Sequence, residues 1–574
     1  MQPSEHTLTL RDGAKLFYRA WLPAQPTDKA IVLFHRGHEH SGRWQETVES
    51  LGLKDVAVFA WDARGHGKSE GERGTAPNVA TLVKDADEWV RGVCTAHGIP
   101  LSNLVVVAQS VGAVIAAAWV HDYAPPVRGL VLAVPAFDVK LYVPLAIPLL
   151  RLKRRLFGPG YVKSYVKANL LTHDREQAQK YAADSMIFPQ ISVDLLLDLY
   201  DTSQRLIADA GAITVPALLL VAGSDWVVKT SAQDRFFDRL SSPIKQLEML
   251  PGFHHAVFHE KDRRAAVGKV REFVEERFAA PPEKPALLNA DKRGYTRLEY
   301  VRLSRPGKYR YAAVRAVMKT FGRLSDGVAL GWRSGFDSGV TLDYIYENQP
   351  RGKTPLGRWI DRSYLNSIGW RGIRQRRVLL EKLLRETIEA AHAAGQPVRI
   401  LDIAAGAGRY VLETIHNLKQ IPISAVLRDY KQENLDASRK LADELGLANV
   451  TVVHGDAFDR ASLAAVTPRP TIAIVSGLYE LIPDNDPLTR SLAGLADVIE
   501  PGGHLIYTNQ PWHPQVEFIA RVLRNREGKP WIMRRRTQAE MDELVRAAGF
   551  EKVTEEIDPW GIFTVSVAKR LAPA

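Results

Sequence analysis

The sequence predicts an α/β protein of two domains, each built on a parallel sheet that helices cover on both faces. Its 574 residues are too many for one ordinary hydrophobic core. Short apolar runs that end in Gly, Asp or Ser recur in two separate series, with amphipathic stretches between them. Continuous apolar runs of this length are typical of strands buried on both faces, and such strands belong to parallel sheets.

The first series lies within residues 30–275. Its apolar runs read AIVLF, VAVFAW, LVVVA, GLVLA, ALLLVA and QLEML. Between the fourth and fifth runs, residues 137–210 form a mainly helical insertion, which we expect to cover the carboxyl edge of the sheet as a cap. We assign residues 1–278 to this first domain.

The second series follows a linker and a basic extension. Residues 279–291 are rich in proline and predict the linker. The second domain, 292–574, opens with the extension at about 292–390 and continues with the runs VRILDIA, ISAVLRD, VTVVHGD, TIAIVSG, HLIYTN and IFTVSVA. These runs, separated by helical stretches, predict a second parallel sheet.

The composition excludes several classes of protein. Cys94 is the single cysteine, so a disulfide framework and a cysteine-rich metal site are excluded; we expect a buried thiol and no metal. Apolar residues make up 46% and charged residues 25%, as in soluble proteins. The first residues lack the apolar core of a signal peptide, and no run offers the ~20 apolar residues of a membrane span. We expect a cytoplasmic protein without an obligate protein partner.

The net charge of +11 is concentrated in two places. Residues 292–319 carry nine Lys or Arg and one Glu, and RLKRR at 151–155 follows the apolar stretch LYVPLAIPLL. A basic patch attracts polyanions or anionic membranes, although it can also be a plain solvated face. The apolar and basic cap segment predicts an element that rests on an anionic membrane surface, such as the inner membrane, and admits a lipid; ordinary packing of the cap is the alternative.

Three residues at strand ends form a candidate catalytic triad. A serine hydroxyl becomes a nucleophile only when a base takes its proton and a third group holds the base. Ser110, Asp225 and His255 each follow a predicted strand, in the chain order Ser, Asp, His that suits an α/β sheet. Each residue alone fits an ordinary turn, but together they predict serine hydrolase chemistry.

The motifs around these residues carry a resemblance to a known family. They are HRGHEHSGRW (35–44), WDARGHGKSEGERG (61–74), AQSVG (108–112), GSDWVV (223–228) and FHHAVFHE (253–260). Residues 5–278 thus resemble the monoacylglycerol lipase-like branch of the α/β-hydrolases. The resemblance implies an ester substrate such as a monoacylglycerol or a lysophospholipid, with a soluble ester as the alternative. Its final His-x₄-Glu motif selects His255, five residues before Glu260.

Two positions depart from the family pattern. Ala108 replaces the first glycine of the turn that carries the nucleophile, where one added methyl group is tolerable because no positive φ is required. Arg36 replaces a glycine beside the backbone amides that would bind the developing oxyanion, which by position belong to Gly37 and Val111. We expect activity to survive both changes.

A loop of small residues marks the second site. In RILDIAAGAGRY, Asp402 ends a strand and the loop leads into a helix, so the backbone can approach a ligand closely. Dinucleotide sites use the same device. The later Gly-Asp-Ala and Pro-Gly-Gly turns favour class I S-adenosylmethionine-dependent methyltransferases, which this half resembles. The resemblance implies a Rossmann-like fold, S-adenosylmethionine as cofactor, and donor-binding residues Asp402, Ala404, Gly406, Gly408, Asp429, Asp456, Ala457 and Ser476.

The acceptor site is predicted only in outline. Tyr479 and Glu480 stand where this family meets its acceptors or the methionine part of its donor, and His513 is a candidate for removing a proton from a hydroxyl, or a plain loop histidine. The absence of an Asn/Asp-Pro-Pro-Tyr motif disfavours methylation of base amino groups.

Taken whole, the chain resembles a bacterial family of bifunctional α/β-hydrolase and class I methyltransferase proteins. The resemblance implies a lipid-like or small ester as one substrate and a small-molecule or lipid methyl acceptor as the other. A nucleic-acid-binding methyltransferase on an inactive hydrolase scaffold is the alternative, suggested by residues 292–319. We expect no nucleic acid partner, because that segment lacks a recognition motif and the triad would be unexplained.

Overall fold

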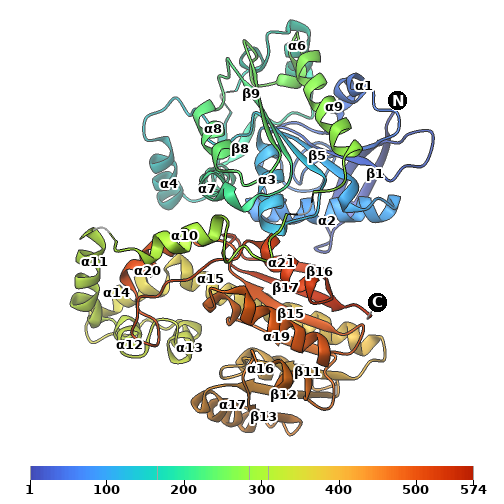
Figure 1. Ribbon diagram of the computed structural model, residues 1–574. Coiled ribbons are helices and arrows are strands. Elements are labelled where there is room, and N and C mark those ends of the chain that lie inside the picture. Colours follow the sequence, from blue (N-terminus) through green and yellow to red (C-terminus); the bar gives the residue numbers. More distant parts are fainter. Residues whose placement is uncertain (1, 165, 284, 308, 573–574) are drawn as a thin grey trace. The chain divides into compact units, whose positions relative to one another are not determined.

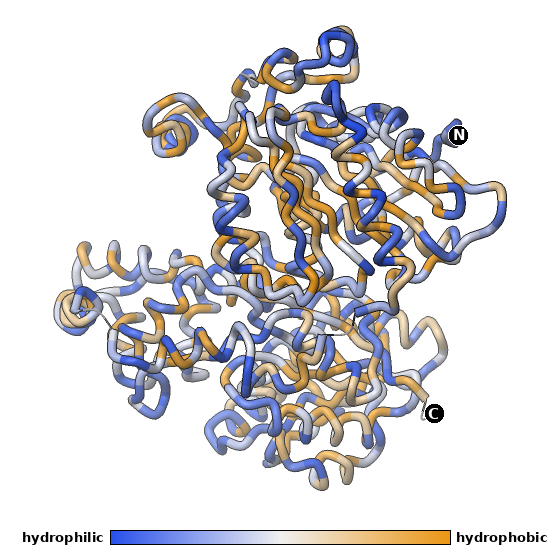
Figure 2. The backbone as a smooth tube through the Cα atoms, turned by 45° about the horizontal axis from the view of Figure 1, so that its top comes forward, coloured by the Kyte–Doolittle hydropathy of each residue, from blue (hydrophilic) through white to orange (hydrophobic). Residues whose placement is uncertain are grey.

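The computed structural model describes residues 2–164, 166–283, 285–307 and 309–572. The chain divides into two compact units, Met1–Pro285 and Ala286–Ala574 (Figure 1). Each unit holds one large sheet, and hydrophobic stretches of backbone gather in the interior of each unit (Figure 2). No helix within the described ranges has both the length and the apolar character that crossing a bilayer requires.

The sheet of the first unit has eight strands within the described residues. In spatial order they are β1 (Ser4–Thr9), β2 (Lys15–Trp21), β4 (Ala57–Trp61), β3 (Ala30–Phe34), β5 (Leu104–Gln109), β6 (Gly129–Ala133), β9 (Ala217–Ala222) and β10 (Lys245–Leu250). All the strands predicted in this half are present and run parallel, whereas β1 and β2, which the apolar pattern did not reveal, pair antiparallel at one edge.

Helices cover both faces of this sheet. Helix α1 (Gln45–Leu51) packs with α9 (Arg264–Ala279), and their apolar side chains form one core with the strands. Helices α2 (Val79–His97), α3 (Val111–Tyr123), α7 (Val193–Asp209) and α8 (Thr230–Arg239) contact one another in that order. Cys94 is buried in α2 as expected, and burial raises the pKa of its thiol to about 11.

The insertion between β6 and β9 is a cap of short elements. It comprises α4 (Ala146–Phe157), β7 (Tyr161–Lys163), α5 (Ala168–Leu171), α6 (Arg175–Ala183), β8 (Gln190–Ser192) and α7. Strands β7 and β8 form a small antiparallel ribbon. None of the side chains of α4 is buried, so this helix presents an apolar and basic surface to its surroundings.

The sheet of the second unit has seven strands within the described residues. In spatial order they are β13 (Val450–His454), β12 (Ile423–Asp429), β11 (Val398–Asp402), β14 (Ile472–Val475), β15 (His504–Asn509), β17 (Thr564–Arg570) and β16 (Phe550–Ile557). The first five are parallel. The expectation of an all-parallel sheet is wrong at the far edge, where β17 runs antiparallel to both β15 and β16.

Helices flank this second sheet in two layers with separate cores. Helices α15 (Ile368–Ala393) and α16 (Arg409–Asn417) pack together over one face, and α19 (Asn485–Val498) packs with α21 (Gln538–Ala547) over the other. The basic extension is helical: α10 (Tyr295–Ser304), α11 (Tyr309–Lys319), α12 (Asp326–Ser334), α13 (Gly339–Glu347) and α14 (Pro355–Leu365) precede α15. Helices α11 to α14 share with α20 (Val516–Val522) a third core rich in aromatic residues.

Candidate active sites

Ser110 stands on a strained turn between β5 and α3. Its φ of 56° and ψ of −116° are unusual for a residue with a side chain, and such strain persists where the surrounding structure enforces it. The backbone N–H of Ser110 donates to Ala133 of β6, and its carbonyl oxygen accepts from Ala136. The strand therefore ends by projecting the serine at the carboxyl edge of the sheet.

The close approach at this turn falls on Gly112. A Cβ atom there would lie 2.4 Å from the carbonyl oxygen of His35 and 2.6 Å from that of Phe34. Ala108, by contrast, lies within β5 in regular register with Phe34 and Leu132. Its extra methyl group is therefore accommodated inside the sheet.

The three predicted catalytic residues form one hydrogen-bonded chain. His255 Nε2 lies 2.7 Å from Ser110 Oγ, and His255 Nδ1 lies 2.8 Å from Asp225 Oδ2. The other carboxylate oxygen of Asp225 accepts from the backbone N–H groups of Val227 and Val228, at 2.7 and 2.9 Å. Burial acts to raise the pKa of Asp225, but His255 and these two amides outweigh it and lower that pKa. Asp225 is thus held as the carboxylate that orients the imidazole.

The neighbouring histidine, His254, makes contacts outside the catalytic triad. His254 packs against His173, with ring centroids 3.7 Å apart and ring planes tilted by 36°, and its Nε2 accepts from Trp226 Nε1. Glu260 accepts from the backbone N–H of His254 at 2.9 Å and so holds the loop that presents His255.

A cavity of about 690 Å³ opens at Ser110. Ser110, His255, Gly37 and Val111 all line it, and a Cβ on Gly37 would lie only 3.0 Å from Val111 Cγ2. The predicted oxyanion donors therefore lie beside the nucleophile. The remaining walls come largely from apolar residues of the cap, among them Val139, Leu141, Tyr142, Val143, Leu149, Leu150, Val162, Leu171, Leu196 and Leu199.

Arg36 lies in the wall of this cavity, and its positive charge is paired with a carboxylate. Its guanidinium donates to both carboxylate oxygens of Glu39, at 2.9 and 2.5 Å, and lies over the ring of Tyr181. Burial alone would lower the pKa of Arg36, but the Glu39 carboxylate raises it. The cation is therefore paired within its own loop.

The small-residue loop of the second unit joins β11 to α16. Gly406 has a φ of 58°, and a Cβ added to it would meet no atom within 4 Å, so the loop faces open space there. Asp429, at the end of β12, accepts from Gly406 N at 2.9 Å through one oxygen, and from Lys431 N and the Asn434 side chain through the other. Three of the roughly four lone-pair sites of that carboxylate are thereby used.

The other predicted donor-binding residues differ in exposure. Asp402 is fully buried, and its carboxylate accepts from Ala404 N and the Tyr410 hydroxyl. Burial raises the pKa of Asp402 to about 7, although these two hydrogen bonds act to lower it.

Gly408 adopts a positive φ at the start of α16. Asp456 is exposed after β13 beside buried Ala457, and half-buried Ser476 follows β14.

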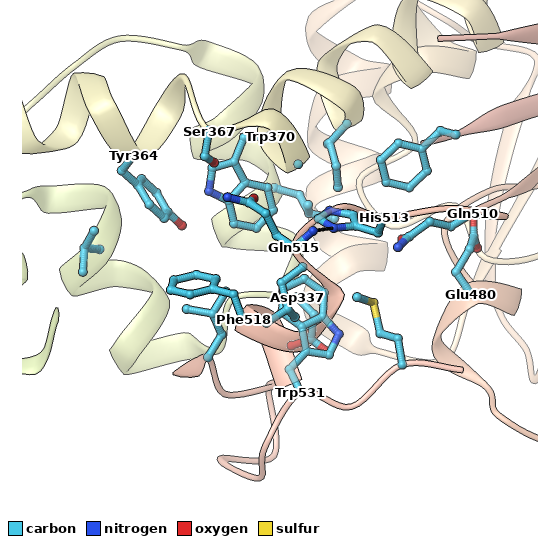
Figure 3. Close-up of a pocket in the computed structure, with 18 of the residues that line it drawn as sticks. Asp337, Tyr364, Ser367, Trp370, Glu480, Gln510, His513, Gln515, Phe518 and Trp531 are labelled. Atoms are coloured by element: carbon cyan, nitrogen blue, oxygen red, sulfur yellow. Dashed lines mark hydrogen bonds between the residues drawn. The ribbon is translucent and has the colours of Figure 1, made fainter. Parts of the chain in front are cut away.

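A second cavity, of about 340 Å³, lies near the carboxyl end of β14 (Figure 3). Glu480 and His513 line it, whereas Tyr479 is buried elsewhere and donates its hydroxyl hydrogen bond to Ser491. None of the predicted donor-binding residues lines it, although Gly477, next to Ser476, does. Gln510, from the segment NQPWHPQ (509–515) at the end of β15 that the sequence marks as a possible wall of an acceptor pocket, also lines it. Arg376, Trp370 and Trp531 line it as well, but they come from distant segments and no motif marks them.

His513 does not have the surroundings of a general base. Burial lowers its pKa to about 3, with a further contribution from Arg535. Its Nδ1 accepts from the backbone N–H of Gln515 at 3.0 Å, so the neutral ring carries its hydrogen on Nε2. The alternative of a structural loop histidine fits these contacts better than the removal of a proton.

The fold and the two sites define a chain in which an α/β-hydrolase unit precedes a methyltransferase-type unit. A family model described as "Serine aminopeptidase, S33" matches residues 25–262, and one described as "Putative methyltransferase" matches residues 270–570. "Uncharacterized protein YnbC" of Escherichia coli K12 is 51% identical over 577 residues, covering 99% of this chain and 98% of that protein. The chain belongs to this family of fused hydrolase and methyltransferase domains.

The first unit also has single-domain relatives. The "Monoacylglycerol lipase" of Mycolicibacterium smegmatis is 26% identical over 273 residues, which are 47% of this chain and 96% of that protein. A solved monoacylglycerol lipase of Paleococcus ferrophilus is 22% identical and covers 48% of this chain and 100% of its own, with a TM-score of 0.41.

Proposed function

We propose that the chain is a bifunctional cytoplasmic enzyme. One site hydrolyses carboxylic esters with Ser110 as nucleophile, and the other transfers a methyl group from S-adenosylmethionine to a small-molecule or lipid acceptor. The observation that carries the first activity is the hydrogen-bonded chain from Ser110 through His255 to Asp225.

The hydrolytic steps follow from this geometry. His255 Nε2 takes the proton of Ser110 as its oxygen bonds to the ester carbonyl carbon, and Asp225 stabilises the imidazolium that forms. The N–H groups of Gly37 and Val111 bind the negative oxygen of the tetrahedral intermediate. The imidazolium then gives its proton to the leaving alcohol. Water, deprotonated by the same histidine, next releases the acid from Ser110.

The cap supports a lipid-like substrate such as a monoacylglycerol or a lysophospholipid. Its apolar side chains line the cavity that reaches Ser110, as an acyl chain requires. Helix α4 and the loop before it expose large apolar side chains beside the basic run 151–155; they are Tyr142, Val143, Leu145, Leu149, Leu152, Leu156 and Phe157. We expect this surface to rest on an anionic membrane.

The loop after β11 fits a nucleoside-bearing methyl donor. Gly406 leaves room for close approach to the backbone, and Asp429 keeps a lone pair for a ribose hydroxyl. Ala457 and Asp456 stand at the end of the second neighbouring strand, where they would meet the adenine. When bound, S-adenosylmethionine supplies an electrophilic methyl group; the chain's own part is to hold that donor and orient the acceptor.

A fluorophosphonate probe tests the hydrolase, because it reacts only with a serine activated by its base. Wild-type protein should be labelled and Ser110→Ala should not. Asp225→Asn should slow labelling by a factor of hundreds to about 10⁴ while keeping the fold. An unlabelled wild type that still binds S-adenosylmethionine would favour the alternative of a methyltransferase on an inactive scaffold.

Calorimetric titration with S-adenosylmethionine tests the donor site. Gly406→Ala should weaken binding about tenfold or more, because the new methyl group occupies the space where the ligand approaches. Gly446→Ala is a matched control, since Gly446 also has a positive φ and open surroundings but lies after α17 (Gln432–Glu444). Equal loss in both variants would count against a donor at Gly406.

A further inference from the structure

The cavity near β14 is closed by the helices of the basic extension. Met318 of α11, Val328 of α12 and Tyr364 of α14 line it, together with residues of α15 and α20. The stretch 292–390, interpreted above as a basic extension, therefore contributes the walls of a binding site in its own unit. Segments so far apart in sequence that converge on one cavity indicate a built site.

Most of the wall is apolar and aromatic. The side chains that make it so are Met318, Val328, Leu342, Trp370, Ile373, Phe518, Ile519, Leu523, Trp531, Met533 and Phe563. In Figure 3, Trp370, Phe518 and Trp531 surround the central space, and Glu480 and Gln510 lie together on one side of it. Such walls favour a ligand that presents a flat apolar ring to them.

The polar side of the cavity contains groups without partners. Glu480 and Gln510 are only 8% and 6% exposed. Within the described residues, neither Glu480 Oε2 nor Gln510 Nε2 has a hydrogen-bond partner. In the aromatic wall, Trp531 Nε1 has none within those residues either. Leaving such groups buried and unpaired lowers stability, and more so when the group is charged. Their convergence on one cavity points to a polar group on a ligand.

The geometry of Glu480 defines which polar group that is. Its Oε1 accepts from the Thr508 hydroxyl at 2.7 Å and lies 3.7 Å from Arg376 Nη1, which fixes the carboxylate. Its Oε2 is left free to accept, so it suits an O–H or N–H donor. His513 cannot accept this hydrogen bond from the ligand, because its Nδ1 already accepts from the backbone N–H of Gln515.

The cavity also lies at the correct edge of the sheet. Gly477 and Glu480 follow β14, and β14 is the direct neighbour of β11, whose end carries the Gly406 loop. Parallel neighbours end at the same edge, so the cavity and the predicted donor loop adjoin.

We propose that this cavity binds the methyl acceptor, and that the acceptor is a mainly apolar, ring-bearing molecule with one hydroxyl or amino group held by Glu480. The inference rests on the proposed methyl transfer and names the substrate class of that site. Glu480 recognises the hydrogen of the group to be methylated, and it would take that proton as the acceptor oxygen or nitrogen gains the methyl group and S-adenosylhomocysteine leaves. The aromatic walls hold the ring.

The test compares two probes on the full chain by calorimetric titration. The probes are 2-naphthol and 2-methoxynaphthalene, which share one ring system but differ in the presence of a donor hydrogen. Wild type should bind 2-naphthol about tenfold more tightly, as a charge-assisted hydrogen bond allows. Glu480→Gln should reduce that preference at least fivefold, whereas Glu527→Gln, an exposed carboxylate paired with Lys529, should retain it.

A second variant gives a result that does not depend on Glu480. Phe518→Ala, away from Glu480 in Figure 3, should weaken both probes by similar factors. Equal affinity of the two probes in wild type, or an unchanged preference in Glu480→Gln, would overturn the assignment.

Binding of S-adenosylmethionine, measured separately, distinguishes the two proposals. Donor binding without probe binding would refute the acceptor class and leave methyl transfer standing. Probe binding that depends on Glu480 in a chain that binds no donor would support the ligand class but refute its role as a methyl acceptor.

Discussion

A single methyl group has opposite consequences at two positions of the turn around Ser110. At Ala108 it is already present and packs within the sheet. At Gly112 it would collide with two backbone carbonyl oxygens, which no rotation of a side chain can relieve. The requirement for a small residue in this turn is therefore strict on the helix side and relaxed on the strand side.

Gly112→Ala should accordingly abolish fluorophosphonate labelling, because α3 must shift and displace Ser110 from His255. Ala108→Gly should keep labelling within about twofold and lower the free energy of unfolding by about 1 kcal/mol, as glycine in a strand does. Rates of labelling and thermal unfolding of the two variants measure both effects. Normal labelling of Gly112→Ala would contradict this account.

Asp402 should make the second unit less stable as the pH rises. Its pKa is about 7 in the folded chain, against 3.8 for an unperturbed aspartate. Above about pH 4 the unfolded chain has released a proton that the folded chain keeps, so the free energy of unfolding falls until the folded group ionises near pH 7.

Asp402→Asn removes that dependence. Between pH 5 and pH 8 the wild type should lose about 2 to 3 kcal/mol more stability than the variant. Denaturant unfolding at the two pH values, without ligand, gives the difference. Parallel losses in both proteins would show that Asp402 titrates normally.

At the scale of elements, helix α4 has an exposed surface that packing does not use. Leu152 and Leu156 are 51% and 64% exposed and do not line the hydrolase cavity. The double variant Leu152→Ser, Leu156→Ser should bind vesicles containing anionic lipid several-fold more weakly. Hydrolysis of a short, water-soluble ester should be unchanged. Unaltered vesicle binding, measured by flotation, would argue that α4 is only the outer wall of the cap.

The elements that the sequence reveals are those with continuous apolar runs. Five runs of the first series became central strands, because strands buried on both faces have no polar residues to interrupt them. The sixth run, QLEML, became the edge strand β10. Strand β1 (SEHTLT) is mostly exposed and has Leu8 as its single apolar residue, and β16 carries four charged residues, so neither gives that signal. The direction of β17 is set by its pairing with β16, which its own residues do not encode.

The same distinction applies to the sites. Ser110, Asp225 and His255 follow strand ends, and strand order alone brings such positions together. The acceptor cavity is different, because its walls come from helices whose apolar faces look like ordinary core positions in sequence. Tyr479 and Glu480 are adjacent in the chain, yet only the structure separates the buried residue from the one that faces the cavity.

At the scale of the whole molecule, each unit has hydrophobic cores made from its own residues. Scanning calorimetry of the full chain should therefore show two transitions. Phosphonylation at Ser110 should shift one of them, and S-adenosylmethionine at ten times its dissociation constant should stabilise the other by about 1.4 kcal/mol. A single transition that responds to both ligands would contradict independent cores.

The two compact units share one polypeptide, and this fixes the stoichiometry of the two proposed activities. Every molecule synthesised carries one Ser110 and one Gly406 loop, so changes in expression or turnover of the protein alter both proposed capacities in equal proportion. If the two reactions run at unequal rates in the cell, the difference must arise from rate constants and substrate supply, since the ratio of sites stays at one to one.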